Sequence, residues 1–186
     1  MAVFGIGVND IGTSRGTSDK HCPYYSRWHS MVRRCYSEYS LNKHPYYKDV
    51  YVCDEWLTFS NFKAWMETQD WEGKELDKDL LGNGKLYSSE TCCFIPKRIN
   101  SFFTERKVSK GLWPTGVTYH KRDRKFYAKF SCPFEGREVH IGSYDNPEEA
   151  GQAYNKKRVE TIIKMVEKED QKTKQIVLNF MKERYK

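Results

Sequence analysis

Long apolar stretches are missing from this sequence of 186 residues. None of its runs approaches the ~18 consecutive apolar residues that a membrane-spanning helix needs, which excludes helical membrane proteins. The N-terminal segment also lacks the basic start and the long apolar core of a secretory signal peptide. We therefore expect a cytoplasmic protein with no membrane partner.

Cysteine pairs with metal-binding spacing are also missing. The six cysteines include no C-x-x-C motif, and disulfides are rare in the cytoplasm. A structural zinc site built from Cys35, Cys53 and Cys92 is one interpretation. We favour the other, in which the thiols are buried and act as small hydrophobic groups, so zinc is not the expected cofactor.

Positive charge and aromatic side chains are plentiful. The 32 Lys and Arg residues outnumber the 25 Asp and Glu residues, for a formal net charge of +7. This balance favours an anionic partner, of which nucleic acid is the commonest; the alternative is a soluble basic domain. Aromatic residues make up 15% of the chain, and we expect them to build cores under a polar surface.

The first half of the chain has a helical pattern after a Gly/Ser/Thr-rich segment, residues 1–21, which is expected to be an irregular arm. Apolar side chains at spacings of three and four predict a helix that begins at Pro23: Tyr25, Trp28, Val32, Cys35 and Tyr39. A second helix is predicted from Asp54, its N-cap, to Gln69. Its aromatic stripe is typical of a core: Trp56, Phe59, Phe62, Trp65 and Met66.

Residues 75–100 have the pattern of a short strand, a Gly-rich turn, a second strand and a helix start. Asp77 and Asp79 lie at the first strand, and Asn100 lies in the helix. A ββα layout of this kind is typical of small metal-dependent nucleases, in which a divalent cation polarises a phosphate and a histidine activates water. None of the five histidines falls within this stretch.

The second half of the chain changes to strand patterns after a polar linker at residues 105–111. Three strands are predicted at 116–119, 125–131 and 137–144, followed by a long helix with Pro147 in its first turn and Asp145 or Asn146 as its cap. We therefore predict an α+β fold with two modules, residues 22–104 and 112–163, and a charged C-terminal helix at 164–186. The second module is a three-stranded antiparallel sheet packed on a helix.

Alternation along these strands divides their side chains between two faces. One face is apolar and is expected to pack on the helix. The other carries polar, basic and aromatic side chains: Thr118, His120, Tyr127, Lys129, Ser131, Glu138 and His140. Such a face suits contacts to phosphates and base edges, and the alternative is an ordinary solvated surface.

Several spaced motifs in the first module resemble the HNH endonucleases, specifically the small homing-type enzymes of bacteriophages. The resemblance covers roughly residues 22–103. Its anchors are Tyr24-x-x-x-Trp28-x-x-Met31-x-x-Arg34-Cys35-Tyr36, Val52-Cys53-Asp54-Glu55-Trp56-x-x-Phe59-x-x-Phe62, Leu76-Asp77-Lys78-Asp79, Gly82-Asn83, Tyr87-Ser88-x-Glu90-x-Cys92 and Asn100. It implies that Asp77 and Asn100 hold Mg²⁺ or another divalent cation. It also implies that Lys78 replaces the catalytic histidine and that Thr91 lies near the asparagine that braces the loop.

The lysine at the histidine position leaves two interpretations open. Lysine side chains titrate near pH ~10.4, which makes them poor general bases at neutral pH. An alignment shifted by one residue puts Asp79 there instead, so Lys78 and Asp79 are both candidate catalytic residues. The first interpretation is a divergent nuclease with Asp77, Asp79 and Asn100 around one cation. The second is a ββα scaffold that only binds DNA.

The second module resembles the Apetala-type (ethylene-response-factor) DNA-binding domain over residues 112–160. Its anchors are Thr115-Gly116-Val117, Phe126-Tyr127-Ala128, Ile141-Gly142-Ser143-Tyr144 and Glu148-Glu149-Ala150-x-x-Ala153-Tyr154. The resemblance implies a sheet laid in the major groove, with the polar face toward DNA. Thr118 and Glu138 stand where arginines are usual in that family, and Arg122, Arg124 and Arg137 in or beside the turns can compensate.

Taken together, these patterns predict a protein that binds double-stranded DNA and, if active, cleaves or nicks it with Mg²⁺ or a similar cation. One alternative is a catalytically inactive DNA-binding regulator. Another is an interaction protein, for example an inhibitor that grips an acidic protein. The charged segment 164–186 is a candidate element for homodimer formation, with an exposed helix as the other interpretation.

Overall fold

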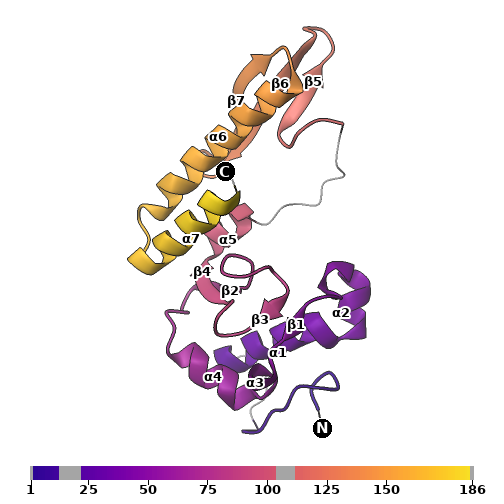
Figure 1. Ribbon diagram of the computed structural model, residues 1–186, viewed down its shortest axis with the longest axis vertical. Helices are drawn as coiled ribbons and strands as arrows, with labels where there is room; N and C mark the ends of the chain where they lie inside the picture. Colours follow the sequence, from indigo (N-terminus) through magenta and orange to yellow (C-terminus); the bar gives the residue numbers. More distant parts are fainter. Residues whose placement is uncertain (1, 13–21, 104–111, 185–186) are drawn as a thin grey trace. The chain divides into compact units, whose positions relative to one another are not determined.

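The computed structural model describes residues 2–12, 22–103 and 112–184, and it divides into two compact units (Figure 1). The first unit extends to Asn100 and the second begins at Ser101, so the boundary lies within one helix. The whole of the predicted linker, residues 105–111, falls outside the described residues. In the part of the chain that the structure describes, no helix is long and apolar enough to cross a membrane. The units contain both helices and strands, which confirms the α+β fold class.

Helix α1, Pro23–Tyr36, begins where the sequence predicts but ends earlier. Proline occupies its first turn, and the Cys22 sulfur accepts a hydrogen bond from the Tyr25 backbone N–H at 3.5 Å. Ser37 is extended and ends the helix, after which α2, Glu38–Lys43, follows. Tyr39 therefore lies outside the α1 stripe and is 66% exposed. A short 3₁₀ turn, η2, follows at Pro45–Tyr47.

The predicted helix from Asp54 to Gln69 is two helices, α3 at Asp54–Leu57 and α4 at Phe59–Glu67. Thr58 between them is extended, and the N-terminal segment pairs with the chain there. The Val8 N–H donates to the Leu57 carbonyl at 2.8 Å, and the Phe59 N–H donates to the Val8 carbonyl at 2.9 Å. Cys53, not Asp54, is the cap residue of α3. Part of the expected irregular arm is thus built into the first unit.

Short strands complete the first unit. Strand β1, Tyr51–Val52, pairs in parallel with β3, Leu86–Tyr87. Strand β2, Lys74–Asp77, pairs antiparallel with β4, Cys93–Pro96, in a register that places Asp77 opposite Cys93. Helix α5, Lys97–Phe103, follows. The strand, turn, strand and helix predicted for this stretch are present, with β3 as an additional strand between the two partners.

Aromatic side chains form the core of the first unit, as their helical spacing predicts. Six large side chains are almost completely buried: Trp28, Trp56, Phe59, Phe62, Met66 and Tyr87. The Trp28 indole donates to the Trp56 carbonyl at 2.7 Å, so the buried polar atom has its partner. This core holds β2 and the loop that follows it.

The second unit is a three-stranded antiparallel sheet in the order β5-β6-β7, with α6 packed on it. Its strands are β5, Val117–His120, β6, Lys125–Cys132, and β7, Arg137–Tyr144. Helix α6, Pro147–Val166, is capped by Asn146, whose side chain accepts from the Glu149 N–H at 2.8 Å. The predicted sheet on a helix is confirmed, and of the two candidate caps it is Asn146 that bonds the helix.

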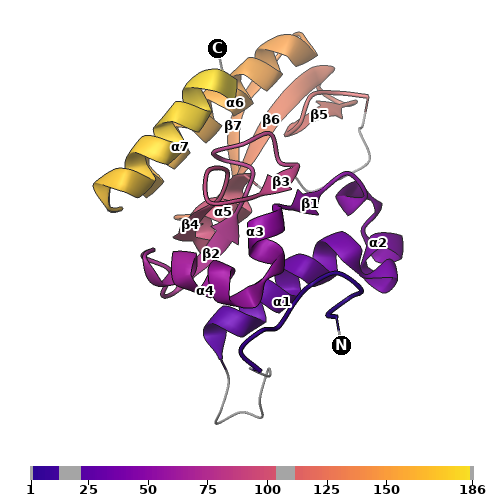
Figure 2. The same cartoon turned by 60° about the horizontal axis from the view of Figure 1, so that its bottom comes forward.

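Residues 164–186 do not form one charged helix. Helix α6 continues to Val166, and a separate helix, α7 at Gln171–Arg184, lies alongside it (Figure 2). Val177 and Met181 of α7 are buried, so this helix is part of the second unit and not an exposed tail. The apolar side chains of α7 pack inside the second unit, although most residues of the segment 164–186 are polar or charged.

Candidate functional site

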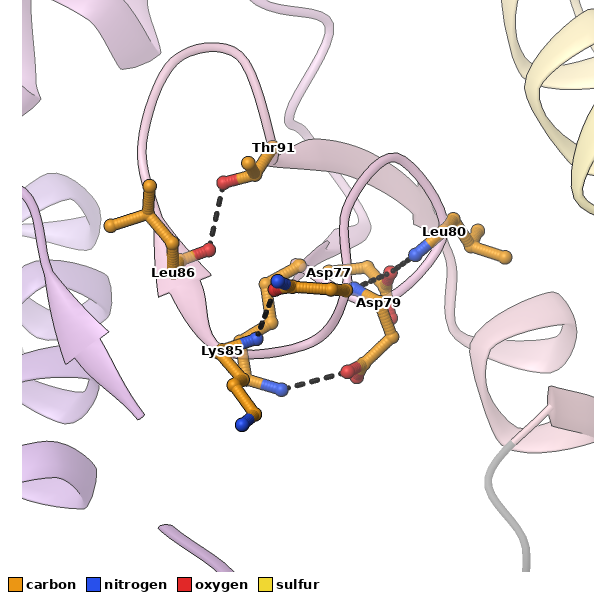
Figure 3. A network of polar contacts seen from close by, with 8 residues as sticks. Asp77, Asp79, Leu80, Lys85, Leu86 and Thr91 are labelled. Atoms are coloured by element: carbon orange, nitrogen blue, oxygen red, sulfur yellow. Dashed lines mark hydrogen bonds and ion pairs between the residues drawn. The ribbon is translucent and has the colours of Figure 1, made fainter. Parts of the chain in front are cut away.

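Asp77 ends strand β2 and points into the first unit, with only 7% of its surface exposed. One carboxylate oxygen accepts the backbone N–H groups of Asp79 and Leu80, both at 2.9 Å (Figure 3). An aspartate that bonds the backbone two and three residues ahead stabilises a turn. Burial raises the pKa of this carboxyl above its ordinary value, and the Leu80 N–H opposes the shift.

Lys78 is also buried, with 8% exposed, and its ammonium group has three neighbours. The nitrogen lies 2.8 Å from a carboxylate oxygen of Asp79. It also lies 5.6 Å from the ring centre of Tyr47 and 5.7 Å from that of Tyr87. An ammonium between aromatic rings and a carboxylate is stabilised by both. Lys78 is therefore held as part of the loop structure.

Asp79, in contrast, keeps a side chain that is 61% exposed. The Gly-rich turn closes against it, because Gly84 has a φ of +75° and a Cβ atom there would collide with the Asp79 carboxylate. Only glycine fits both the backbone conformation and the contact. The two glycines of the predicted turn thus have separate roles, since Gly82 instead approaches Thr91, with 3.0 Å between its virtual Cβ and the Thr91 Cβ.

Thr91 braces the loop between β3 and β4. Its hydroxyl donates to the Leu86 carbonyl at 2.7 Å (Figure 3). The same oxygen accepts the Ser88 N–H at 3.1 Å. These bonds tie the two ends of the segment 86–91 together.

Asn100, in α5, is tied to the neighbouring strand, since its amide donates to a Glu75 carboxylate oxygen at 2.9 Å. The residues expected to surround a divalent cation thus have other partners: Asp77 accepts two backbone N–H groups and Asp79 holds an ammonium. Within the described residues, no three His, Cys, Asp or Glu side chains gather as metal ligands. As arranged, the Lys78 ammonium supplies the positive charge beside Asp79.

The cysteines of the alternative zinc site are largely hidden. Burial raises the pKa of Cys35 and of Cys92 to about 12, and it also raises the pKa of Cys53. These raised pKa values favour protonated thiols at neutral pH in the metal-free protein. Cys35 and Cys92 lie in the hydrophobic core, where they pack as small apolar groups.

The outer face of the second unit brings most of the predicted DNA-facing residues together. Five side chains from all three strands line one hollow of about 270 Å³: Thr118, His120, Tyr127, Lys129 and His140. Thr118 is paired across the strands with Tyr127, and Lys129 with His140. Ser131 and Glu138 form the next pair on this face. Alternation on the strands thus produces one continuous polar surface, which we call the outer face.

Aromatic rings form the centre of the outer face. The His120 and Tyr127 rings stack at 4.7 Å with an interplanar angle of 6°, and the His140 ring meets Tyr127 at 4.9 Å. Asp123, in the β5–β6 turn, accepts the Tyr127 hydroxyl and lies 3.1 Å from the His120 ring nitrogen Nδ1. Hydrogen bonds from Tyr127 and Arg122 lower the pKa of Asp123. The carboxylate therefore fixes the ring stack.

The predicted basic residues border the outer face at both ends. Arg122 and Arg124 lie in the β5–β6 turn, and Arg137 begins β7 after the β6–β7 turn. Arg122 donates to Asp123 at 3.2 Å, and Arg137 lies 2.9 Å from Glu135. Their guanidinium groups are largely exposed despite these partners. Positive charge is therefore available on either side of the aromatic hollow.

Two residues of this surface were missed by sequence reasoning. Ser143 faces outward, opposite Tyr127, because the register shifts between Ala128 and Lys129 and strict alternation fails on β7. Gly142, an isolated glycine within a strand pattern, is a signal for such a bulge. The other is Asp123, and its signal is an acid between two arginines in a short turn.

Comparisons of this chain with models of protein families, with curated proteins and with solved structures found no match. A function for this protein is therefore inferred from the geometry of its two units.

Proposed function

We propose that this protein binds double-stranded DNA through the outer face of its β5–β7 sheet. The observation that carries the proposal is the single hollow lined by Thr118, His120, Tyr127, Lys129 and His140. Donors, acceptors and aromatic rings converge there from three strands, and arginines border it at both ends. A sheet with this surface suits base edges in a groove, with phosphates contacted from the rims.

The charge of the chain supports the same partner. A net charge of +7 favours a polyanion, and Arg122 and Arg137 lie at opposite ends of the sheet. Phosphates on the two strands of a duplex are contacted in this way when a sheet enters the groove between them. The rival interpretation is a protein partner with an acidic surface. Such a partner would be bound by positive charge alone and would not require a hollow lined by both hydrogen-bond donors and acceptors.

For the first unit, we propose that the ββα unit serves as a DNA-holding scaffold. The supporting observation is the buried Lys78 ammonium, which is bonded to Asp79 at 2.8 Å in place of a histidine free to accept a proton. Metal-dependent phosphodiester cleavage is the second candidate, favoured by the exposed Asp79 carboxylate next to Asp77.

Binding is tested by measuring the affinity for duplex DNA over a range of salt concentrations. Arg122→Gln combined with Arg137→Gln should weaken binding and reduce the slope of log affinity against log salt by about two, because two phosphate contacts are lost. The matched control is Lys164→Gln with Lys182→Gln, which removes the same charge from exposed positions on α6 and α7. Equal losses in both variants, or no affinity in the wild type, would contradict the proposal.

Cleavage is tested on the same samples with Mg²⁺ or Mn²⁺ added, using the wild type, Asp77→Ala and Lys78→Ala. We expect bound, intact duplexes in every lane. Discrete cuts that disappear in Asp77→Ala while binding persists would instead establish a divergent metal-dependent nuclease.

A further inference from the structure

Lys129 and Glu138 form an ion pair on the outer face, between the aromatic hollow and the β6–β7 turn. The Lys129 ammonium lies 3.1 Å from a Glu138 carboxylate oxygen, and the side chains are 42% and 58% exposed. They come from adjacent strands, where Lys129 is paired with His140 and Glu138 with Ser131, so the two are diagonal neighbours. One donor group and one acceptor group are thus presented side by side.

On its other side, Lys129 is joined to the residue before β5. Its backbone N–H donates to the Gly116 carbonyl at 2.8 Å, so the neighbour toward β5 is a residue without a side chain. Gly116 has a φ of +78°, and a Cβ atom there would collide with the Tyr154 ring on α6, which restricts the position to glycine. The Lys129 side chain is itself 42% exposed at the hollow that it lines.

The Lys129–Glu138 pair differs from the other acidic contacts of this unit. Asp123 already has Tyr127, Arg122 and His120 as partners. Glu135 lies in the β6–β7 turn, beside Arg137. Glu138, in contrast, lies within strand β7 and its side chain is on the outer face. At this place its carboxylate would be repelled by a DNA phosphate. A carboxylate at such a place fits a DNA-binding surface when it accepts a hydrogen bond from a base.

Base-edge chemistry then identifies the target. In the major groove a G·C pair presents the acceptors O6 and N7 on guanine next to the N4 amino donor on cytosine. A lysine suits the first and a glutamate the second. An exposed ion pair contributes little stability. Both side chains can therefore leave their mutual contact and hydrogen-bond to a base edge instead. We propose that Lys129 and Glu138 together read one G·C base pair, an inference that rests on the proposed duplex binding.

The test is a selection of binding sites from a random duplex DNA library with the full chain. The wild type should select sites with one position at which a G·C pair is preferred about tenfold over A·T. Glu138→Gln should abolish that preference, because an amide also suits adenine. The matched control is Glu135→Gln, which removes the same charge from the same hairpin and should keep the preference.

Each outcome separates the inference from the proposed function. If the wild type binds duplex DNA and Glu138→Gln selects the same sites, the two residues do not recognise a G·C pair, and the proposed DNA binding stands. A loss of the preference in both variants would also overturn it, since the effect would then be one of net charge. A wild type that binds no duplex would remove the proposed function and this inference with it.

Discussion

At the scale of single residues, the first unit uses polar side chains to hold its loop. Asp77 accepts two backbone N–H groups, Lys78 fills the space between two tyrosine rings, and Thr91 joins the ends of the loop. Each of these groups is a candidate for chemistry when the sequence alone is considered. In the folded protein their partners are part of the protein itself.

Lys78→Ala tests this structural role. Removal of the buried side chain leaves Tyr47, Tyr87 and Asp79 without their shared contact, and we expect the free energy of unfolding to fall by about 2 kcal/mol. Lys85→Ala, an exposed lysine of the same loop, should change it by less than about 0.5 kcal/mol. Urea denaturation measures both, and equal effects would show that Lys78 does not support the loop.

Gly84→Ala tests the contact between the turn and Asp79. We expect a loss of about 2 kcal/mol or more, because both a positive φ and the carboxylate oppose a Cβ atom. Gly73→Ala is the control, since Gly73 has a φ of +70° with nothing described within 4 Å of its virtual Cβ. Asp79→Ala should restore part of the loss at Gly84 and none at Gly73. Identical losses without such rescue would show that the clash is not the cause.

Asp77 gives a prediction for pH dependence. Burial raises the pKa of its carboxyl in the folded state above the ordinary value of 3.8, so the folded state binds the proton more tightly than the unfolded state. The resulting penalty is absent below about pH 3.8 and grows as the pH rises through the folded-state pKa. Asp77→Asn keeps the acceptor oxygen and removes the charge. Relative to the wild type, it should therefore gain stability as the pH rises from 3 to 7.

The measurement is the difference between the unfolding free energies of Asp77→Asn and the wild type at several pH values, since other acids cancel in that difference. A difference that shrinks as the pH rises would mean that the charged carboxylate stabilises the fold.

At the scale of helices and strands, the ends of elements depend on single polar groups. Asn146 caps α6, and the aspartate before it binds Lys125 instead, at 2.6 Å. Asn146→Ala should lower the free energy of unfolding by about 1 kcal/mol, while Asp145→Ala should cost less than about 0.5 kcal/mol. Thermal unfolding of both variants decides which residue is the cap. The reverse order would assign that role to Asp145.

Most elements could be predicted from the sequence, and the exceptions have identifiable causes. The spacing of aromatic residues predicts the helices that contain Trp28 and Trp56, because the aromatic side chains of each helix must lie on one buried face. The break at Thr58 could not be predicted, since it depends on pairing with Val8, which is distant along the chain. The bulge beside Ile141 depends on the register between two strands. Local patterns do not contain such long-range contacts.

The same limit applies to the candidate sites. Alternation alone places Thr118, Tyr127 and Lys129 on one face, because a strand has a period of two. The orientation of Lys78 could not be predicted in this way, since its partners come from Tyr47 and Tyr87 as well as from its own loop. A motif position specifies where a residue lies along the chain, whereas its partners decide what it can do.

At the scale of the whole molecule, the two units differ in what their polar side chains contact. The first has a core of aromatic side chains beneath a loop held by internal polar bonds. The second presents a sheet whose inner face packs on α6 and whose outer face stays accessible. We propose that this sheet binds the duplex and supplies the specificity.

The most direct test of that claim is a nuclear magnetic resonance titration of the ¹⁵N-labelled full chain with a duplex DNA. We expect the largest chemical-shift changes on Thr118, Tyr127, Lys129 and His140, and only small changes at exposed positions of α6 such as Lys156, Glu160 and Lys164. Changes concentrated on α6 and α7, or no changes at all, would contradict it.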